Sequence, residues 1–238
     1  MIKFFRKIRY DLMEKNKTGK YVKYAIGEIV LVVIGILIAL QVNNWNENRN
    51  FRKTQNRYLS QLEIDIDSMH FQYKGIAQYS KAYHDNARAV YNILKSCEIS
   101  QDQKASFDQL LITFNDFMIL FQIRDTYEEM LSANLLAGIE DKQFKSIVTE
   151  FFAQRDAMQM YINEFKQDLS LDYEVVKDHV TFGFDEMNRP TVEYDILQLC
   201  NSSDFTNAIF HAVRTRENIS RMTMILLQKL ESMRDMLA

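Results

Sequence analysis

The chain is poor in the residues that interrupt helices. Its 238 residues include six glycines and a single proline, Pro190. Folds rich in β-sheet need frequent turn residues, so this scarcity argues against them and favours long, uninterrupted helices. The alternation of polar and apolar residues that is typical of strands is almost absent from the chain. The composition therefore predicts an all-α fold.

Histidine and cysteine are also scarce, which argues against a metal centre. The chain has four histidines and two isolated cysteines, and no zinc-ligand spacing. The nearest pairs of histidine and carboxylate are Asp67 with His70 and Asp172 with His179, which exposed faces of amphipathic helices explain as well. A Gly-rich phosphate loop and a Gly-x-Ser-x-Gly turn are missing from the sequence. We therefore predict no metal, no cofactor and no enzymatic activity.

The charge is divided unevenly along the chain. Residues 1–24 carry eight Lys or Arg against Asp11 and Glu14, a charge of +6. Residues 43–238 contain 21 basic and 29 acidic residues, a charge of −8. An acidic main part repels phosphates and argues against nucleic acid as a partner. A basic segment before an acidic body is typical of a membrane protein whose orientation follows its charges.

An apolar segment separates these two parts of the chain. Residues 25–42 read AIGEIVLVVIGILIALQV, with Glu28 as their only charge. Eighteen helical residues span about 27 Å, close to the hydrocarbon thickness of a bilayer. Trp45 follows at the distance expected of an interfacial anchor. We predict a transmembrane helix over 25–42, a cytoplasmic or interfacial stub over 1–24, and a periplasmic domain over 43–238 of a bacterial inner-membrane protein.

An apolar segment of this length has two other interpretations. A buried core helix would also be apolar, but it would not need the basic flank or the following Trp45. A cleaved signal peptide would need a small-residue cleavage site, and none follows the apolar run. The pattern favours an uncleaved signal anchor.

One face of the predicted transmembrane helix suits helix packing. At 100° per residue, Glu28, Gly35 and Ala39 lie within about 20° of a common direction. Gly35-x-x-x-Ala39 is a pair of small residues of the kind that lets helices approach in bilayers. This face predicts a homo-oligomer, and the alternative is that Glu28 extends to the headgroup layer.

A heptad pattern continues after the apolar segment and predicts a first helix that extends to about residue 95. Its steps of three and four contain one polar residue, Ser80. The apolar positions are Leu59, Leu62, Ile66, Met69, Tyr73, Ile76, Tyr83, Ala87, Val90 and Leu94.

Apolar periodicity and capping residues predict further helices after this one. They cover residues 101–124, 126–136, 141–169, 192–199 and 204–237. The stretch 171–184 is predicted to be helical as well. Ser100 with Gln103 and Thr126 with Glu129 match the capping-box pattern. The final helix is expected to point Phe205, Ile209, Val213, Met222, Ile225, Leu226, Leu230 and Met233 inward. Long amphipathic helices with short connections predict an antiparallel bundle.

Cys97 and Cys200 lie at the ends of predicted helices, in a domain expected to face an oxidising compartment. Their position favours proximity and a disulfide, but each would also fit as a buried apolar residue. Both interpretations stay open at the level of sequence.

Three stretches at the start of the chain carry a resemblance: MIKFFRKIR, TGKYVKYAI (18–26) and GEIVLVVIGILIALQVNNWNE (27–47). Together they closely resemble the start of an uncharacterised family of single-span membrane proteins. That family is abundant in Bacteroidota and is classed as a domain of unknown function. TYEEMLSANLLAGIEDKQFKSIVTEFF (126–152) resembles a second, looser signature of it. The resemblance implies an inner-membrane protein of a Gram-negative cell with a periplasmic domain, and it implies no activity.

The leading functional hypothesis is a membrane-anchored interaction or scaffolding protein of the cell envelope, which binds itself or another envelope protein. The second hypothesis is a ligand-sensing helical domain, which would need a partner subunit because only about 24 residues precede the membrane segment. An enzyme of unknown type is the third.

Overall fold

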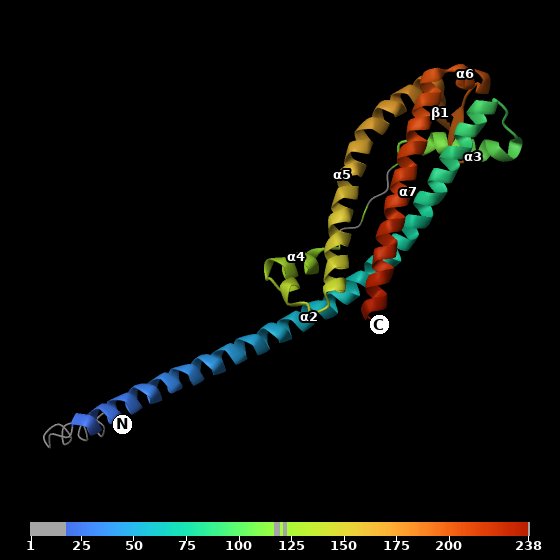
Figure 1. Cartoon of the computed structure of the whole chain (residues 1–238). Coiled ribbons are helices and arrows are strands. Elements are labelled where there is room, and N and C mark those ends of the chain that lie inside the picture. Colours follow the sequence, from blue (N-terminus) through green and yellow to red (C-terminus); the bar gives the residue numbers. More distant parts are fainter. Residues whose placement is uncertain (1–17, 117–119, 121–122, 238) are drawn as a thin grey trace. The chain divides into compact units, whose positions relative to one another are not determined.

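The computed structural model describes residues 18–116, 120 and 123–237. Its elements are α2 (Thr18–Ser96), α3 (Gln101–Ile112), α4 (Asp125–Ser132), the 3-10 helix η1 (Leu136–Gly138), α5 (Lys142–His179), β1 (Thr181–Phe184), β2 (Pro190–Glu193), α6 (Ile196–Asn201) and α7 (Ser203–Leu237). The all-α class is confirmed, with one short hairpin added to it (Figure 1). The chain divides into two compact units, Met1–Arg57 and Tyr58–Ala238. The predicted basic stub lies largely outside the described residues.

The first unit contains the apolar part of α2. Its large apolar side chains are exposed from Val22 to Trp45, and none of the most apolar stretch is buried against the residues that the structure describes. Within the described residues, α2 is the one helix that is long and apolar enough to cross a membrane. The helix predicted over 25–42 is confirmed as a helix of that character.

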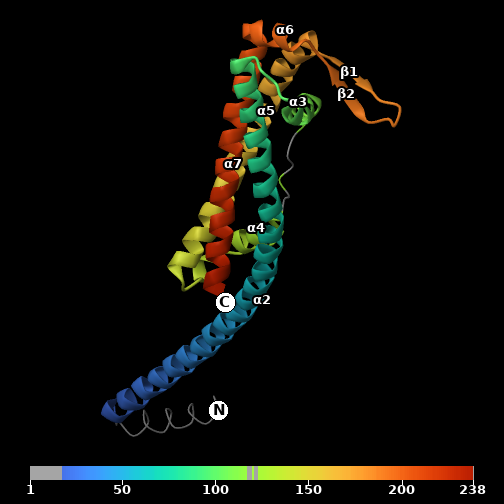
Figure 2. The ribbon, with the colours of Figure 1, turned by 90° about the vertical axis from the view of Figure 1, so that its right-hand side faces the viewer.

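The second unit is a bundle of three long helices: the part of α2 from Tyr58 onward, α5 and α7 (Figures 1 and 2). Contacts between α5 and α7 show that these helices are antiparallel. Lys229 Nζ lies 2.7 Å from Glu150 Oε2, and His211 Nδ1 lies 2.5 Å from Asp172 Oδ2. The start of α5 therefore meets the end of α7.

α7 is antiparallel to α2 as well. Arg234 Nε donates to Asp67 Oδ1 at 2.6 Å, and the rings of Tyr91 and Phe210 lie 5.6 Å apart. Consequently α2 and α5 run in the same direction. α3 lies beside one end of the bundle and α4 beside the other (Figure 2).

The helix predicted over 101–124 is shorter than expected. It begins with the predicted capping box, in which Ser100 and Gln103 exchange hydrogen bonds, but it ends at Ile112. The Thr113 hydroxyl donates to the Gln109 carbonyl at 2.7 Å, and the chain turns through Phe114, whose side chain is buried. Such back-bonding by threonine competes with continuation of the helix.

The second predicted capping box is not formed. α4 begins at Asp125, after Arg124, and its N-terminus has no side-chain cap. The prediction for α5 was correct, because the Asp141 carboxylate caps it by accepting from the backbone of Gln143 and Phe144.

An antiparallel hairpin replaces part of the helix predicted over 171–184, and the start of the one predicted over 192–199. α5 ends at His179, and β1 pairs with β2 so that Phe182 faces Val192. The Asp185 carboxylate accepts from the backbone N–H groups of Met187 and Arg189 and so closes the turn. β-branched and aromatic residues on both arms favour this pairing.

Two hydrophobic clusters fill the bundle. The first contains Leu62, Ile66, Met69, Phe151, Leu226 and Leu230, among others. The second, toward α3 and α6, contains Val90, Phe107, Leu169, Phe205, Ile209 and Ala212, among others. The predicted heptad positions of α2 therefore form the core. Ile225, which was expected to point inward, is 41% exposed, because Leu226 and Leu230 occupy the seam instead.

Candidate functional site

The predicted packing face lies on the first unit. Glu28 is half-buried and Ala39 is exposed. A Cβ atom added to Gly35 would meet no other atom within 4 Å. Glycine in a helix interior costs about 1 kcal/mol relative to alanine, and no contact in the described part of the chain requires it here. Trp45, the predicted interface anchor, is 62% exposed, and the guanidinium of Arg49 lies 5.7 Å from its ring centre.

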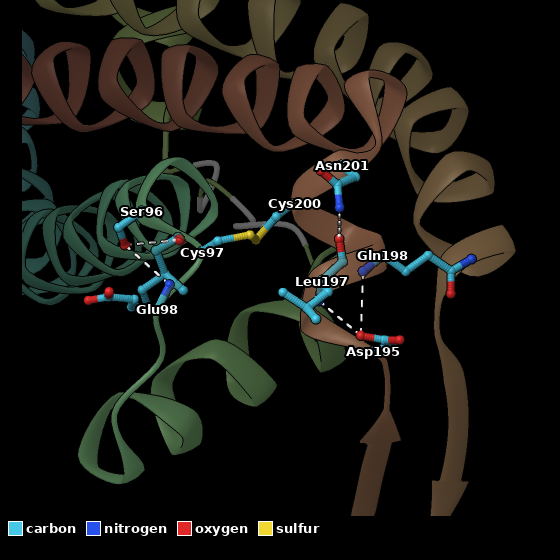
Figure 3. Close-up of a disulfide and its surroundings, with 9 residues drawn as sticks. Ser96, Cys97, Glu98, Asp195, Leu197, Gln198, Cys200 and Asn201 are labelled. Carbon is cyan, nitrogen blue, oxygen red and sulfur yellow. Dashed lines mark hydrogen bonds between the residues drawn. A yellow bond between two sulfur atoms is a disulfide. The ribbon is translucent and has the colours of Figure 1, made fainter.

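The two cysteines are joined. Cys97 and Cys200 form a disulfide with their Cα atoms 5.8 Å apart, within the range that such bonds require (Figure 3). Cys97 follows the end of α2 in the left-handed conformation, with φ 56°, and its N–H donates to the carbonyl of Ile93. This is the usual way for a helix to end, although the position more often holds glycine. Here it turns the chain so that the sulfur of Cys97 points toward α6.

α6 holds the other half of the disulfide. It has only six residues, and its N-terminus is capped by the Asp195 carboxylate, which accepts from the N–H groups of Leu197 and Gln198 (Figure 3). The cap fixes the short helix after β2 and thereby places Cys200 opposite the end of α2. The disulfide links the first long helix directly to the segment that leads into α7.

The pairs of histidine and carboxylate considered for metal binding have other partners. Asp67 pairs with Arg234, whose Nη1 also lies 3.2 Å from His70 Nδ1. Asp172 pairs with His211 and not with His179. Among the described residues, no group of three His, Cys, Asp or Glu side chains could hold a metal ion.

His179 takes part in the start of α7. Its Nδ1 lies 2.8 Å from the Val175 carbonyl, and its Nε2 lies 2.9 Å from the Ser202 hydroxyl. The same hydroxyl accepts from the N–H of Phe205 and so caps α7. This group orients the two ends of neighbouring helices.

A small cavity lies between the two hydrophobic clusters. It has a volume of about 30 Å³, and three elements of the bundle contribute to its lining. Ile162 belongs to the first cluster and Phe165 to the second, while Ile219 packs against both. Its polar lining residues are Tyr79, Ser80, Tyr83, Asp116 and Arg216. The residues around the cavity therefore form a polar layer between two apolar clusters.

Arg216 is the central group of this layer. It lies on α7 and is only 3% exposed. Its Nη2 donates to the Phe114 carbonyl at 2.9 Å, and its guanidinium carbon lies 4.1 Å from the ring centre of Tyr83. The Tyr83 hydroxyl in turn donates to the carbonyl of Thr113. The turn that ends α3 thus holds Arg216 from one side.

Two nitrogen atoms of Arg216 have no acceptor among the described residues. Within the described chain, Nε and Nη1 are buried and make no hydrogen bond. A buried donor without a partner costs about 1–3 kcal/mol, and more when it is charged. Burial lowers the pKa of Arg216, whereas Tyr83, Tyr79 and Asp116 oppose that change electrostatically. The cation is stabilised by aromatic faces and dipoles, and only at a distance by a carboxylate.

A second buried arginine provides a comparison. Arg155, on α5, is 2% exposed, and its Nε and Nη1 also lack hydrogen-bond partners among the described residues. Unlike Arg216, it has a carboxylate nearby, since Asp156 Oδ1 lies 3.7 Å from its Nη1. It does not line the cavity.

Arg216 was not predicted as a functional residue, although the sequence contains a signal for it. Val213, Arg216 and Ile219 follow one another at steps of three along α7, which places the arginine in the inward-facing row. Ser80 is the polar interruption in the heptads of α2, and it lines the same cavity. A charged residue in one apolar row and a polar residue in another would together have indicated a buried polar layer.

The fold and these features define the class of the protein. It is a helical-bundle protein with an apolar helix near its N-terminus and a disulfide-linked second unit. The chain belongs to the Family of unknown function (DUF6090), whose model matches residues 28–215. The match begins at Glu28 and ends one residue before Arg216. No curated protein and no solved structure matches the chain.

Proposed function

We propose that the protein is a membrane-anchored interaction protein of the bacterial cell envelope, with its N-terminus in the cytoplasm and its helical unit in the periplasm. Its role is to hold a binding surface at the inner membrane, and it has no catalytic function. The partners are a second copy of the chain through the membrane helix and other envelope proteins through the bundle.

The observation that carries this proposal is the exposure of the apolar part of α2. From Ile26 to Val42 the large apolar side chains are exposed in the described part of the chain. Soluble monomers rarely expose a continuous apolar surface of this size. A bilayer removes it from water without a protein partner, and the segment has the length that a bilayer requires.

Two observations support the orientation. The +6 charge of residues 1–24 favours retention of that end in the cytoplasm. The disulfide between Cys97 and Cys200 lies in the second unit, and disulfides persist in the periplasm but are rare in the reducing cytosol.

We expect a reporter that is active only in the periplasm, fused after Ala238, to be active, and a reporter that works only in the cytoplasm to be silent at the same position. Changing Lys15, Lys17, Lys20 and Lys23 to glutamate should reduce the periplasmic signal, because the orienting charge is then reversed. Activity of each fusion is measured in whole cells and corrected for the amount of protein.

Replacing four exposed lysines of the second unit is the matched control for this experiment, since it removes as many charges without touching the flank of the membrane helix. Lys74, Lys81, Lys95 and Lys142, which are all exposed, serve for this purpose. The orientation is wrong if the cytoplasmic reporter is active after Ala238, or if both sets of lysine variants have the same effect.

Ligand sensing is a second candidate function, and the cavity around Arg216 favours it. The chemistry of that cavity is argued next.

A further inference from the structure

The bundle buries a positive charge beside an empty space. Arg216 has free N–H groups at Nε and Nη1, and no carboxylate of the described chain forms an ion pair with it. The cavity of about 30 Å³ adjoins its guanidinium. A volume of this size holds about two water molecules, or the three heavy atoms of a carboxylate group whose substituent extends toward the opening. Water would accept the hydrogen bonds but would leave the charge uncompensated.

We propose that this cavity binds the carboxylate group of a small organic acid, with Arg216 as its counter-ion. A carboxylate has acceptor oxygens for the free N–H groups and one negative charge for the buried cation. The inference is independent of membrane anchoring, because every lining residue belongs to the second unit.

The shape of the cavity limits the ligand. Arg216 is held on one side by the Phe114 carbonyl and the Tyr83 ring, so its free edge has a fixed direction. Ser80 lines the same space, and its hydroxyl donates to the Ala77 carbonyl at 3.2 Å, which leaves its oxygen able to accept but not to donate. The arginine is therefore the group that recognises an anion.

The remaining walls of the cavity suit a short apolar substituent. Ile162 and Phe165 are buried side chains of α5 and line the cavity directly. Tyr79 is 51% exposed and stacks on Tyr83 with 5.6 Å between ring centres, so it forms part of the opening toward solvent. A ligand with a carboxylate and a small aliphatic group matches both the charged end and these walls.

Asp116 gives the site selectivity among anions. It is exposed, lines the cavity and interacts electrostatically with both Arg216 and Tyr79. Its charge opposes the entry of a doubly charged anion more strongly than that of a single carboxylate. Desolvation also costs more for a dianion. We therefore expect acetate or propionate to bind and sulfate or phosphate to bind much more weakly.

The test uses the full chain in a mild detergent. Thermal unfolding is followed by circular dichroism at neutral pH while sodium acetate replaces sodium chloride at constant ionic strength. We expect the melting temperature to rise and to saturate with acetate, because the folded state alone binds it. Sodium sulfate at equal ionic strength should raise the melting temperature only through its general exclusion from the protein surface, in proportion to its concentration and without saturation. The absence of a saturating rise with acetate, or an equal saturating rise with sulfate, overturns the proposal.

Variants then locate the site. Arg216→Lys keeps the charge but loses the planar group, and it should weaken acetate binding by about tenfold or more, the effect of one lost hydrogen bond to a charged group. Arg155→Lys is the matched control, since it changes an equally buried arginine that does not line the cavity. Equal weakening in both variants overturns the assignment.

A third variant covers the case in which Arg216→Lys does not fold. Ser80→Val fills part of the cavity with methyl groups and leaves Arg216 unchanged. We expect this variant to keep its helical spectrum and to lose the rise in melting temperature with acetate. If the acetate effect is retained at full size, the ligand does not occupy this cavity.

Discussion

Replacing both cysteines by serine is expected to lower the free energy of unfolding of the second unit by about 4–5 kcal/mol. The disulfide joins residues 103 positions apart, and loop-closure entropy in the unfolded chain predicts an effect of that order for so long a loop. For a domain of this size, the melting temperature should fall by roughly 10–15 °C. The measurement is thermal unfolding of Cys97→Ser/Cys200→Ser beside the oxidised protein.

Reduction supplies the control for this prediction. A thiol reductant should lower the melting temperature of the wild-type protein to near that of the double variant, and it should leave the double variant unchanged. A wild-type protein that is insensitive to reduction would mean that the disulfide does not form in the purified protein. A reductant effect on the double variant would mean that the loss arises elsewhere.

Gly35→Ile with Ala39→Ile is expected to convert an oligomer in mild detergent into a monomer. The small residues allow the backbones of two helices to approach, and two isoleucine side chains remove that approach. Gly35 faces open space within the chain, so the change should not disturb the second unit. Light scattering measures the mass of the protein, and circular dichroism checks that the helical content is kept.

Gly27→Ile is the matched control, because Gly27 also faces open space but lies about 80–120° around the helix from Gly35 and Ala39. It should keep the oligomer mass. A wild-type protein that is already monomeric, or a double variant with its full mass, would exclude this packing face. Glu28 would then have no packing role, and its extension to the headgroup layer would be the better explanation.

The long helices could be predicted from sequence because their evidence is local and repeated. The heptads of α2 run from Leu59 to Leu94 without proline, and the Asp141 and Ser100 caps mark the starts of two later helices. Each of these signals concerns residues within a few positions of one another. Tertiary contacts do not override them.

The features that were missed depend on distant contacts. α3 stops at Ile112 because Phe114 turns into the core, where its carbonyl receives Arg216 from α7. The hairpin is held against α3 by Tyr194, whose hydroxyl donates to Asp108 at 2.8 Å. Neither contact can be read from a window of neighbouring residues. The cavity is missed for the same reason, since its lining comes from segments far apart in the chain.

The covalent link between the end of α2 and α6 also changes how the protein would carry mechanical load. A pull between the N-terminal part of α2 and the end of α7 passes from Ser96 through the disulfide to Asn201. Residues 98–199, which include α3, α4, α5 and the hairpin, lie outside this covalent path, so their length is not added to the stretched chain while the link is oxidised. Once it is reduced, the same pull extends them as well. The disulfide therefore makes the bundle a tether of short, fixed contour length.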